Sequence, residues 1–195
     1  MAHPVRFRNS IYLLLVFALS CKNETKQTAT IPKLYVAASD KGLQQHKGFL
    51  YYNGKKFSGR TYELYPNGDT ALLFSYFNGK EEGWCLKWYE NKKLMEERLY
   101  VAGRKEGEHK GWWPDGTPRF DYNFKDDEHE GEAKEWFNNG KPSRFFRYAK
   151  GHEDGLQRMW WEDRRVRANY VVKGGQQYGL IGRKLCLNDD GAKTN

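Results

Sequence analysis

Glycines recur at a constant interval of 24 residues along this chain, and no other feature of the sequence restricts the fold as strongly. The series is Gly59, Gly83, Gly107, Gly131, Gly155 and Gly179. No insertion disturbs the interval, so the glycines delimit five full units, 59–82, 83–106, 107–130, 131–154 and 155–178. Such a repeat predicts a stacked array, because one unit of this size cannot bury its apolar face alone.

Each unit has the pattern of a β-hairpin followed by a link to the next hairpin. Two large apolar residues stand five and six positions after the glycine: Leu64-Tyr65, Trp88-Tyr89, Trp112-Trp113, Trp136-Phe137 and Trp160-Trp161. A turn-forming stretch follows, then a second run with apolar residues at alternate positions, and then a second turn. The composition agrees with short strands, since 16% of the residues are aromatic and only 3 are methionine.

The aromatic pair, the Asn-Gly or Asp-Gly turn, the second aromatic strand and the Asn-Gly-Lys-like link together resemble the MORN-repeat-variant family over residues 48–187. The resemblance implies an all-β fold, an elongated single-layer antiparallel sheet of stacked 24-residue hairpins. Bacterial members of the family are often labelled antitoxin-like or membrane-binding. The turn glycine is absent at 90–93 and 162–165, and we expect turns of a different shape there.

The N-terminus has the features of an export signal. Arg6 and Arg8 precede an apolar run over residues 11–19, which is too short to span a bilayer and suits a signal peptide. Ala18-Leu19-Ser20-Cys21 resembles a bacterial lipoprotein box, in which the cysteine is lipidated and becomes the first mature residue; the alternative is an ordinary signal peptide with a chance cysteine. Lys22 is not the aspartate that would resemble an inner-membrane retention signal, so we expect an outer membrane lipoprotein of the bacterial cell envelope.

These patterns divide the chain into four parts. We expect a signal peptide over 1–20, a lipidated Cys21 with a tether over 21–47, a repeat domain over 48–187 and a tail over 188–195. Within the repeat domain, Gly48–Ser58 and Gly179–Leu187 each resemble half a unit and are predicted to cap the array.

The length of the hairpin turn decides which aromatic of each pair faces the core. A three-residue turn over 114–116 fits proline followed by aspartate and a left-handed glycine, and a two-residue turn would cost a ladder hydrogen bond at Pro114. With three residues, Trp112 shares a face with Phe120 and Tyr122, and Arg98, which interrupts this apolar face, has to extend toward its edge. The predicted core row is then Leu64, Trp88, Trp112, Trp136 and Trp160, and a two-residue turn would exchange this row with the opposite one.

The opposite row is the candidate binding surface. It consists of Tyr65, Tyr89, Trp113, Phe137 and Trp161, which stand among charged neighbours. A ladder of partly exposed aromatic residues suits contact with a partner protein. The alternative is that these rings pack only with one another and with lysine and arginine stems.

No pattern of a catalytic, metal or cofactor site is present. His3, His46, His109, His129 and His152 show no metal-ligand spacing, and no phosphate loop or dinucleotide fingerprint occurs. Apart from Cys21, the cysteines are Cys85 and Cys186, which lie four units apart in the array and are too distant for a disulfide. The acidic stretch 126–130 is interpreted as a link between hairpins rather than as a cation site.

The sequence therefore predicts a non-enzymatic, lipid-anchored scaffold without cofactors that binds a protein at the cell envelope. The formal net charge of +8 leaves binding of anionic lipid or envelope polysaccharide as the alternative. Neutralisation of a toxin, suggested only by the family label, would require a partner in a different compartment. Nucleic acid is not an expected partner, because charges of both signs alternate along the chain.

Overall fold

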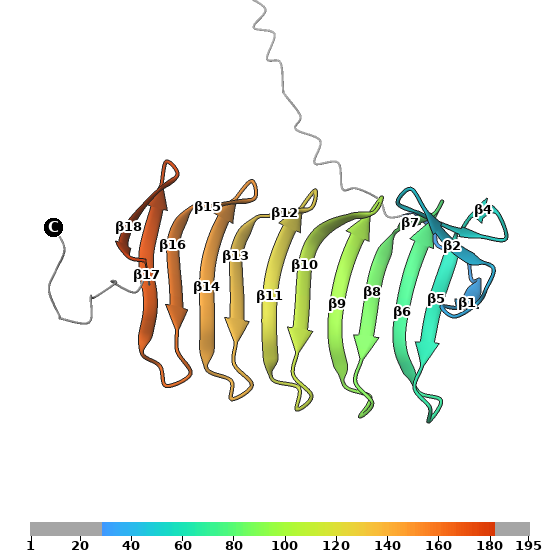
Figure 1. Cartoon of the computed structure of the whole chain (residues 1–195), viewed down its shortest axis with the longest axis horizontal. Coiled ribbons are helices and arrows are strands. Elements are labelled where there is room, and N and C mark those ends of the chain that lie inside the picture. Colours follow the sequence, from blue (N-terminus) through green and yellow to red (C-terminus); the bar gives the residue numbers. More distant parts are fainter. Residues whose placement is uncertain (1–28, 182–195) are drawn as a thin grey trace, which may run out of the picture.

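The described part of the protein, residues 29–181 of a computed structural model, is all-β and contains no helix, as predicted (Figure 1). Its main element is one elongated, mostly antiparallel sheet of 15 strands whose neighbours follow the chain order. The predicted signal peptide, Cys21, Cys186 and the tail predicted over 188–195 lie outside the described residues.

The long sheet is built almost entirely from the repeat units. Its successive strands are β1 (Tyr35–Ala37), β5 (Gly59–Leu64), β6 (Thr70–Phe77), β8 (Gly83–Trp88), β9 (Leu94–Val101), β10 (Arg104–Trp112), β11 (Pro118–Lys125), β13 (Gly131–Trp136), β14 (Pro142–Ala149), β16 (Gly155–Trp160), β17 (Val166–Lys173) and β18 (Gln176–Leu180). Three short strands extend the links: β7 (Lys80–Glu81), β12 (Glu128–His129) and β15 (His152–Glu153). Each full unit therefore contributes one hairpin, and the hairpins stand side by side (Figure 1).

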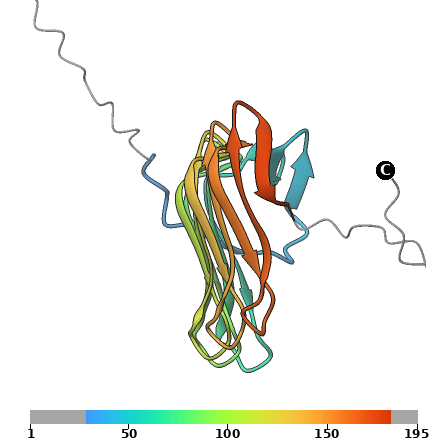
Figure 2. The ribbon, with the colours of Figure 1, turned by 90° about the vertical axis from the view of Figure 1, so that its left-hand side faces the viewer.

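The N-terminal end of the array carries a different structure. Strand β1 pairs in parallel with β5, and a separate sheet of three strands is formed by β2 (Leu43–His46), β3 (Phe49–Tyr52) and β4 (Lys55–Lys56). The end-on view in Figure 2 shows this small sheet to one side of the long one. Phe57, which is 2% exposed, contacts the rings of Tyr52 and Tyr76 and so joins the two sheets. The segment predicted as a half-unit cap thus turns away from the long sheet.

The hairpin turns have three residues, as the sequence predicts. The Trp113 amide donates to the Thr117 carbonyl at 2.8 Å, and the Gly116 amide donates to the Trp113 carbonyl at 2.8 Å. Gly116 has a φ of 94°, in the left-handed region. This is the type I turn with a glycine bulge that Pro114-Asp115-Gly116 favours.

The prediction of differently shaped turns at 90–93 and 162–165 is wrong. Lys92 and Arg164 take the glycine position with φ values of 67° and 71°, and the backbone hydrogen bonds are the same. The preceding Asn91 and Asp163 explain this, because each side-chain oxygen accepts a hydrogen bond from the amide two residues on. Such a bond holds the turn when glycine is absent. All five turns carry Asn or Asp at this position.

The glycine that defines the period stands where the ladder is interrupted. At the junction of the first and second units, Tyr76 of β6 pairs with Glu81, but Leu73 of β6 pairs with Leu86. The segment from Glu81 to Leu86 therefore has two residues more than the segment of β6 that it faces. Gly83 lies in this bulge with a φ of 79°. The equivalent glycines of the next three units have φ values of 66°, 77° and 78°. A left-handed residue is needed at each bulge, and glycine adopts that conformation at the least cost.

The links between hairpins are two-residue turns in which both residues have positive φ, the type that suits the twist of adjoining strands. Asn78-Gly79 is one example. In the second unit the first position is Ala102, with a φ of 53°. Its amide donates to the carboxylate of Glu82 at 2.7 Å.

Ala102→Gly is expected to raise the free energy of unfolding by about 1 kcal/mol, because an alanine side chain is strained in the left-handed region. The backbone hydrogen bond to Glu82 does not depend on the side chain and is retained. Gly103→Ala, one residue further at a φ of 80°, should lower stability and serves as the matched control. Urea unfolding measures both, and a destabilised Ala102→Gly protein would contradict the strain.

A bulge in each second strand reverses the predicted assignment of faces. Gly111 pairs with Phe120, but the next residue, Trp112, pairs with Pro118. Arg119 is therefore an extra residue on β11. Along β10, successive side chains point to opposite faces without interruption. Gly111 and Trp113 therefore share the face of Phe120, whereas Trp112 lies on the opposite face.

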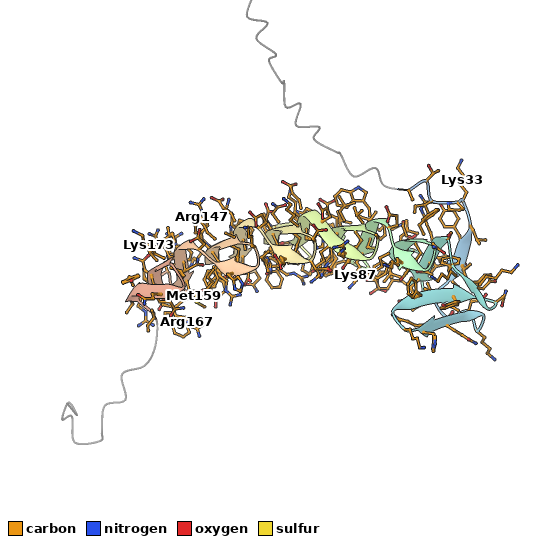
Figure 3. The ribbon with its side chains drawn as sticks, turned by 90° about the horizontal axis from the view of Figure 1, so that it is seen from above. Lys33, Lys87, Arg147, Met159, Arg167 and Lys173 are labelled. Atoms are coloured by element: carbon orange, nitrogen blue, oxygen red, sulfur yellow. The ribbon has the colours of Figure 1, made fainter. Side chains whose placement is uncertain are left out.

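The same shift recurs in all five hairpins. The predicted core row of Leu64, Trp88, Trp112, Trp136 and Trp160 thus lies on the other face, and the turn length alone was not sufficient to assign it. Figure 3 agrees, with Lys87, Met159 and Arg167 on one side of the sheet and Arg147 on the other.

We name the two sides by their residues. The aromatic face carries Phe120, Tyr122, Phe124 and the row Tyr65, Tyr89, Trp113, Phe137 and Trp161. The tryptophan face carries the row Leu64, Trp88, Trp112, Trp136 and Trp160. Among residues 29–181, nothing forms a second layer over either face along the middle of the array (Figures 1 and 3).

Candidate binding surface

The aromatic row that the sequence predicts as a binding surface lies in register along the aromatic face. Successive members are two strands apart, which places them about 10 Å from one another. Trp161 is 50% exposed, and the other four rings are half-buried. The structure thus brings the predicted residues into one row, and their role as a contact surface stays a prediction.

Three members of the row also join neighbouring units. Each donates a side-chain hydrogen bond to the backbone carbonyl of the tryptophan one unit further along. The pairs are Tyr65 to Trp88 at 2.7 Å, Tyr89 to Trp112 at 2.8 Å and Trp113 to Trp136 at 3.3 Å. Phe137 has no donor. These three rings therefore stabilise the stacking of hairpins, whatever else they contact.

A groove of about 590 Å³ opens on the aromatic face between Trp113 and Phe137, and Tyr122 and Glu135 line it. The Arg119 guanidinium lies 5.7 Å from the centre of the Trp113 ring. Arg119 is the bulge residue, and its extra position directs the side chain to this face. The groove combines an aromatic wall with a cation and a carboxylate, as protein-binding sites commonly do.

Glu96 is the most buried carboxylate of the aromatic face, with 10% of its side chain exposed. It contacts three cations. Arg98 Nη2 lies 2.9 Å from Glu96 Oε2, Arg119 pairs with Oε1, and Lys87 Nζ lies 3.7 Å away. The expectation that Arg98 extends to the edge is wrong, because this carboxylate holds the guanidinium within the sheet.

A second polar cluster lies in the next unit. Glu135 Oε1 accepts hydrogen bonds from the Tyr122 hydroxyl at 2.7 Å and from Arg144 Nη1 at 2.8 Å. Burial, followed by the bond to Glu135, raises the pKa of Tyr122 well above its usual range. The hydroxyl therefore remains a hydrogen-bond donor and is not activated as a base or nucleophile.

The most buried row of the array stands two positions after each repeat glycine. It consists of Thr61, Cys85, His109, Ala133 and Gln157, all at most 5% exposed. His109 Nε2 donates to the Leu99 carbonyl at 2.9 Å, and Gln157 Nε2 donates to the Arg147 carbonyl at 2.8 Å. Both acceptors lie beside the glycine bulge. The Arg147 carbonyl also accepts from the Asp154 amide at 2.9 Å, and the Arg147 amide donates to Gln157 Oε1 at 3.3 Å, so the glutamine supplies a partner to a backbone amide beside the interrupted ladder.

The sequence did not indicate this buried row, because its five members differ in chemistry. Their constant position, two residues after each repeat glycine, was the feature that could have predicted it. Cys85 is free and buried. Because Cys186 lies outside the described residues, the absence of a bond between the two cysteines stays a prediction. Burial raises the pKa of the Cys85 thiol to about 12, so the thiolate needed for reaction is scarce at neutral pH.

His109 and His129 make the stability of the array depend on pH. His129 lies between the rings of Phe124 and Tyr148, at 4.3 and 4.8 Å. Burial lowers the pKa of both histidines, and the charge of Lys105 lowers that of His129 further. Both are therefore neutral in the fold at a pH where the unfolded chain begins to bind protons.

The free energy of unfolding is expected to fall as the pH drops below about 6.5, the ordinary histidine pKa, toward the lower pKa of the folded state. His109→Gln should reduce this loss, because glutamine makes the equivalent hydrogen bond at Gln157 and does not titrate. His46→Gln, at an exposed position, is the control. Denaturant unfolding between about pH 7.5 and about pH 5 tests the slope, and equal slopes for both variants would contradict the role of His109.

The tryptophan face also contains grooves. One, of about 640 Å³, is lined by Tyr62, Leu73 and Trp88 near the N-terminal end. Two others, of about 390 and 450 Å³, adjoin Trp160 near the C-terminal end. Trp88 and Trp160 were predicted as core residues, so the sequence did not indicate these grooves.

Within residues 29–181, no three histidine, cysteine, aspartate or glutamate side chains are grouped as metal ligands would be. The same part of the chain contains no helix with the length and apolarity needed to span a bilayer. The geometry defines an open, single-layer β-repeat protein with an aromatic row and recessed grooves on both faces. No protein-family model matches the chain, and no curated protein sequence matches it.

Proposed function

We propose that this protein is a non-enzymatic module, anchored to the bacterial outer membrane through a lipid on Cys21, that binds a partner protein at the cell envelope. The contact surface is the aromatic row, with its centre at the groove between Trp113 and Phe137. The observation that carries this proposal is the groove itself, where the aromatic rings adjoin the Arg119 guanidinium and the Glu135 carboxylate.

The charges of the aromatic face favour a protein over an anionic lipid or polysaccharide. Carboxylates stand among the cations of this face: Glu96 pairs with Arg98, Arg119 and Lys87, and Glu135 pairs with Arg144. A face on which carboxylates reduce the positive charge attracts a uniformly anionic surface less than a face of cations alone would. Mixed aromatic and polar chemistry instead suits a protein partner, in which buried aromatic residues supply most of the binding energy.

Site-specific crosslinking in intact envelopes, followed by recovery of the protein, tests the surface. Trp161→Ser removes the most exposed ring of the row and should reduce the crosslinked partner about tenfold or more, as loss of a tryptophan contact can do. Trp84→Ser is the matched control, since Trp84 is 45% exposed on the other face. Equal recovery with both variants would reject the aromatic row, and recovery of lipid alone would favour the lipid-binding alternative.

The anchor has a separate test. Radiolabelled palmitate should enter the wild-type protein and not Cys21→Ala. Lys22→Asp is expected to move the labelled protein to the inner membrane, because aspartate after the lipidated cysteine resembles the retention signal. Absence of label from the wild type would end the lipoprotein hypothesis without affecting the binding surface.

A further inference from the structure

Two grooves adjoin Trp160 on the tryptophan face. Both are lined by Pro142 and Trp160, and their volumes are about 450 and 390 Å³. Because they share these two residues, we treat them as one depression. One groove extends toward the middle of the strands, where Trp136, Phe145 and Leu156 form its apolar floor. The other extends toward the hairpin turn. This depression, the Trp160 groove, is large enough to take apolar side chains from an extended peptide.

Cations stand at both ends of the Trp160 groove. Lys134 and Arg158 line the inner part, and Lys141 and Arg164 line the part near the turn. Lys134 is paired with Glu132 at 2.7 Å, whereas Lys141 donates to the neutral backbone carbonyl of Glu162 at 3.1 Å and keeps its charge. Among the described residues, Lys141 and the two arginines are therefore the cations of the groove without a carboxylate partner.

Arg158 and Arg164 have no carboxylate within ion-pair distance among residues 29–181, in contrast to Arg98, Arg119 and Arg144 on the aromatic face. Arg158 lies 5.9 Å from the centre of the Trp160 ring and donates from Nε to the Asn169 amide oxygen at 3.1 Å. That arrangement orients the guanidinium at the edge of the groove while its positive charge remains uncompensated. Glu135, the one carboxylate that lines the groove, is already paired with Arg144.

From this geometry we infer that the Trp160 groove binds an extended, acidic segment of a partner protein, with an apolar side chain between Trp136 and Trp160 and carboxylates on Arg158 and Arg164. The inference rests on the proposed role in protein binding but uses the opposite face of the sheet. A recessed apolar floor with a cation at each end is complementary to alternating apolar and acidic side chains. A lipid surface would instead require a broad basic face.

Fluorescence anisotropy of the purified protein with a labelled peptide of alternating aspartate and leucine tests the inference. The peptide should bind, and added salt should weaken the binding. Replacement of its aspartates by asparagine, or of its leucines by serine, should each reduce affinity about tenfold or more, since both chemistries contribute. Equal binding of the asparagine peptide would overturn the role of charge.

Variants of the protein locate the contact. Arg158→Gln and Arg164→Gln should each weaken peptide binding about threefold, as expected for partly exposed ion pairs, with a larger loss in the double variant. Lys173→Gln is the matched control, because Lys173 is exposed on the neighbouring strand β17 but lies outside the groove. If all three variants bind alike, the groove is not the site.

Two further outcomes identify a different occupant and would also overturn the inference. Vesicles of phosphatidylglycerol that bind in an Arg158-dependent manner, while the peptide does not, would assign the groove to lipid. Peptide binding that occurs only after Asp189→Asn and Asp190→Asn would assign it to the chain's own C-terminal residues, where those aspartates follow Leu187. Neither result affects the aromatic row, whose test depends on Trp161.

Discussion

Gly111→Ala is expected to destabilise the protein by about 1–3 kcal/mol, the range for overpacking a filled site. A Cβ atom at Gly111 would lie 2.2 Å from Cε1 of Phe120 and 2.7 Å from two further atoms of that ring. Phe120 is 8% exposed and pairs directly with Gly111, so the ring has little space in which to move. Urea unfolding measures the loss.

The same substitution tests the assignment of the two faces. Lys110→Ala, one residue earlier on the tryptophan face, should change stability by less than about 0.5 kcal/mol. In a Phe120→Ala background, Gly111→Ala should cost little, because the ring that it would meet is gone. An unchanged cost in that background would mean that Gly111 and Phe120 do not share a face, and Trp112 rather than Trp113 would then belong to the aromatic row.

Glu96→Ala should lower the free energy of unfolding by about 2–3 kcal/mol. Removing one partner of a buried ion pair leaves uncompensated charge, which costs about 3–5 kcal/mol when burial is complete. The side chains of Arg98 and Arg119 are 35% and 28% exposed, so water compensates them in part and the lower figure applies. Thermal and urea unfolding should agree on the direction.

Two further variants separate charge compensation from simple loss of a side chain. Glu97→Ala, on the opposite face of the same strand, should have little effect. The double variant Glu96→Leu with Arg98→Phe copies Leu72 and Phe74, the equivalent residues of the first unit, and should recover most of the loss. If this double variant is as unstable as Glu96→Ala, the defect is not the unpaired charge of Arg98.

Much of the fold followed from local sequence signals. Gly83 and its equivalents occupy left-handed positions, which glycine adopts more readily than other residues, so their spacing predicted the unit boundaries. Pro114-Asp115-Gly116 predicted the three-residue turn for a similar reason. The turns at Lys92 and Arg164 differ from the prediction, which depended on the missing glycine, although the preceding Asn91 and Asp163 already indicated the same turn.

The sequence by itself determined the all-β architecture, the 24-residue period and the hairpin turns, because these depend on conformational preferences of a few adjacent residues. Only the tertiary structure decided which aromatic of each pair shares the face of Phe120. The one-residue bulge at Arg119 arises from pairing between strands, and a shift of one residue moves every following side chain to the other face. The Trp160 groove likewise depends on neighbouring units, since Pro142 and Trp160 come from different hairpins.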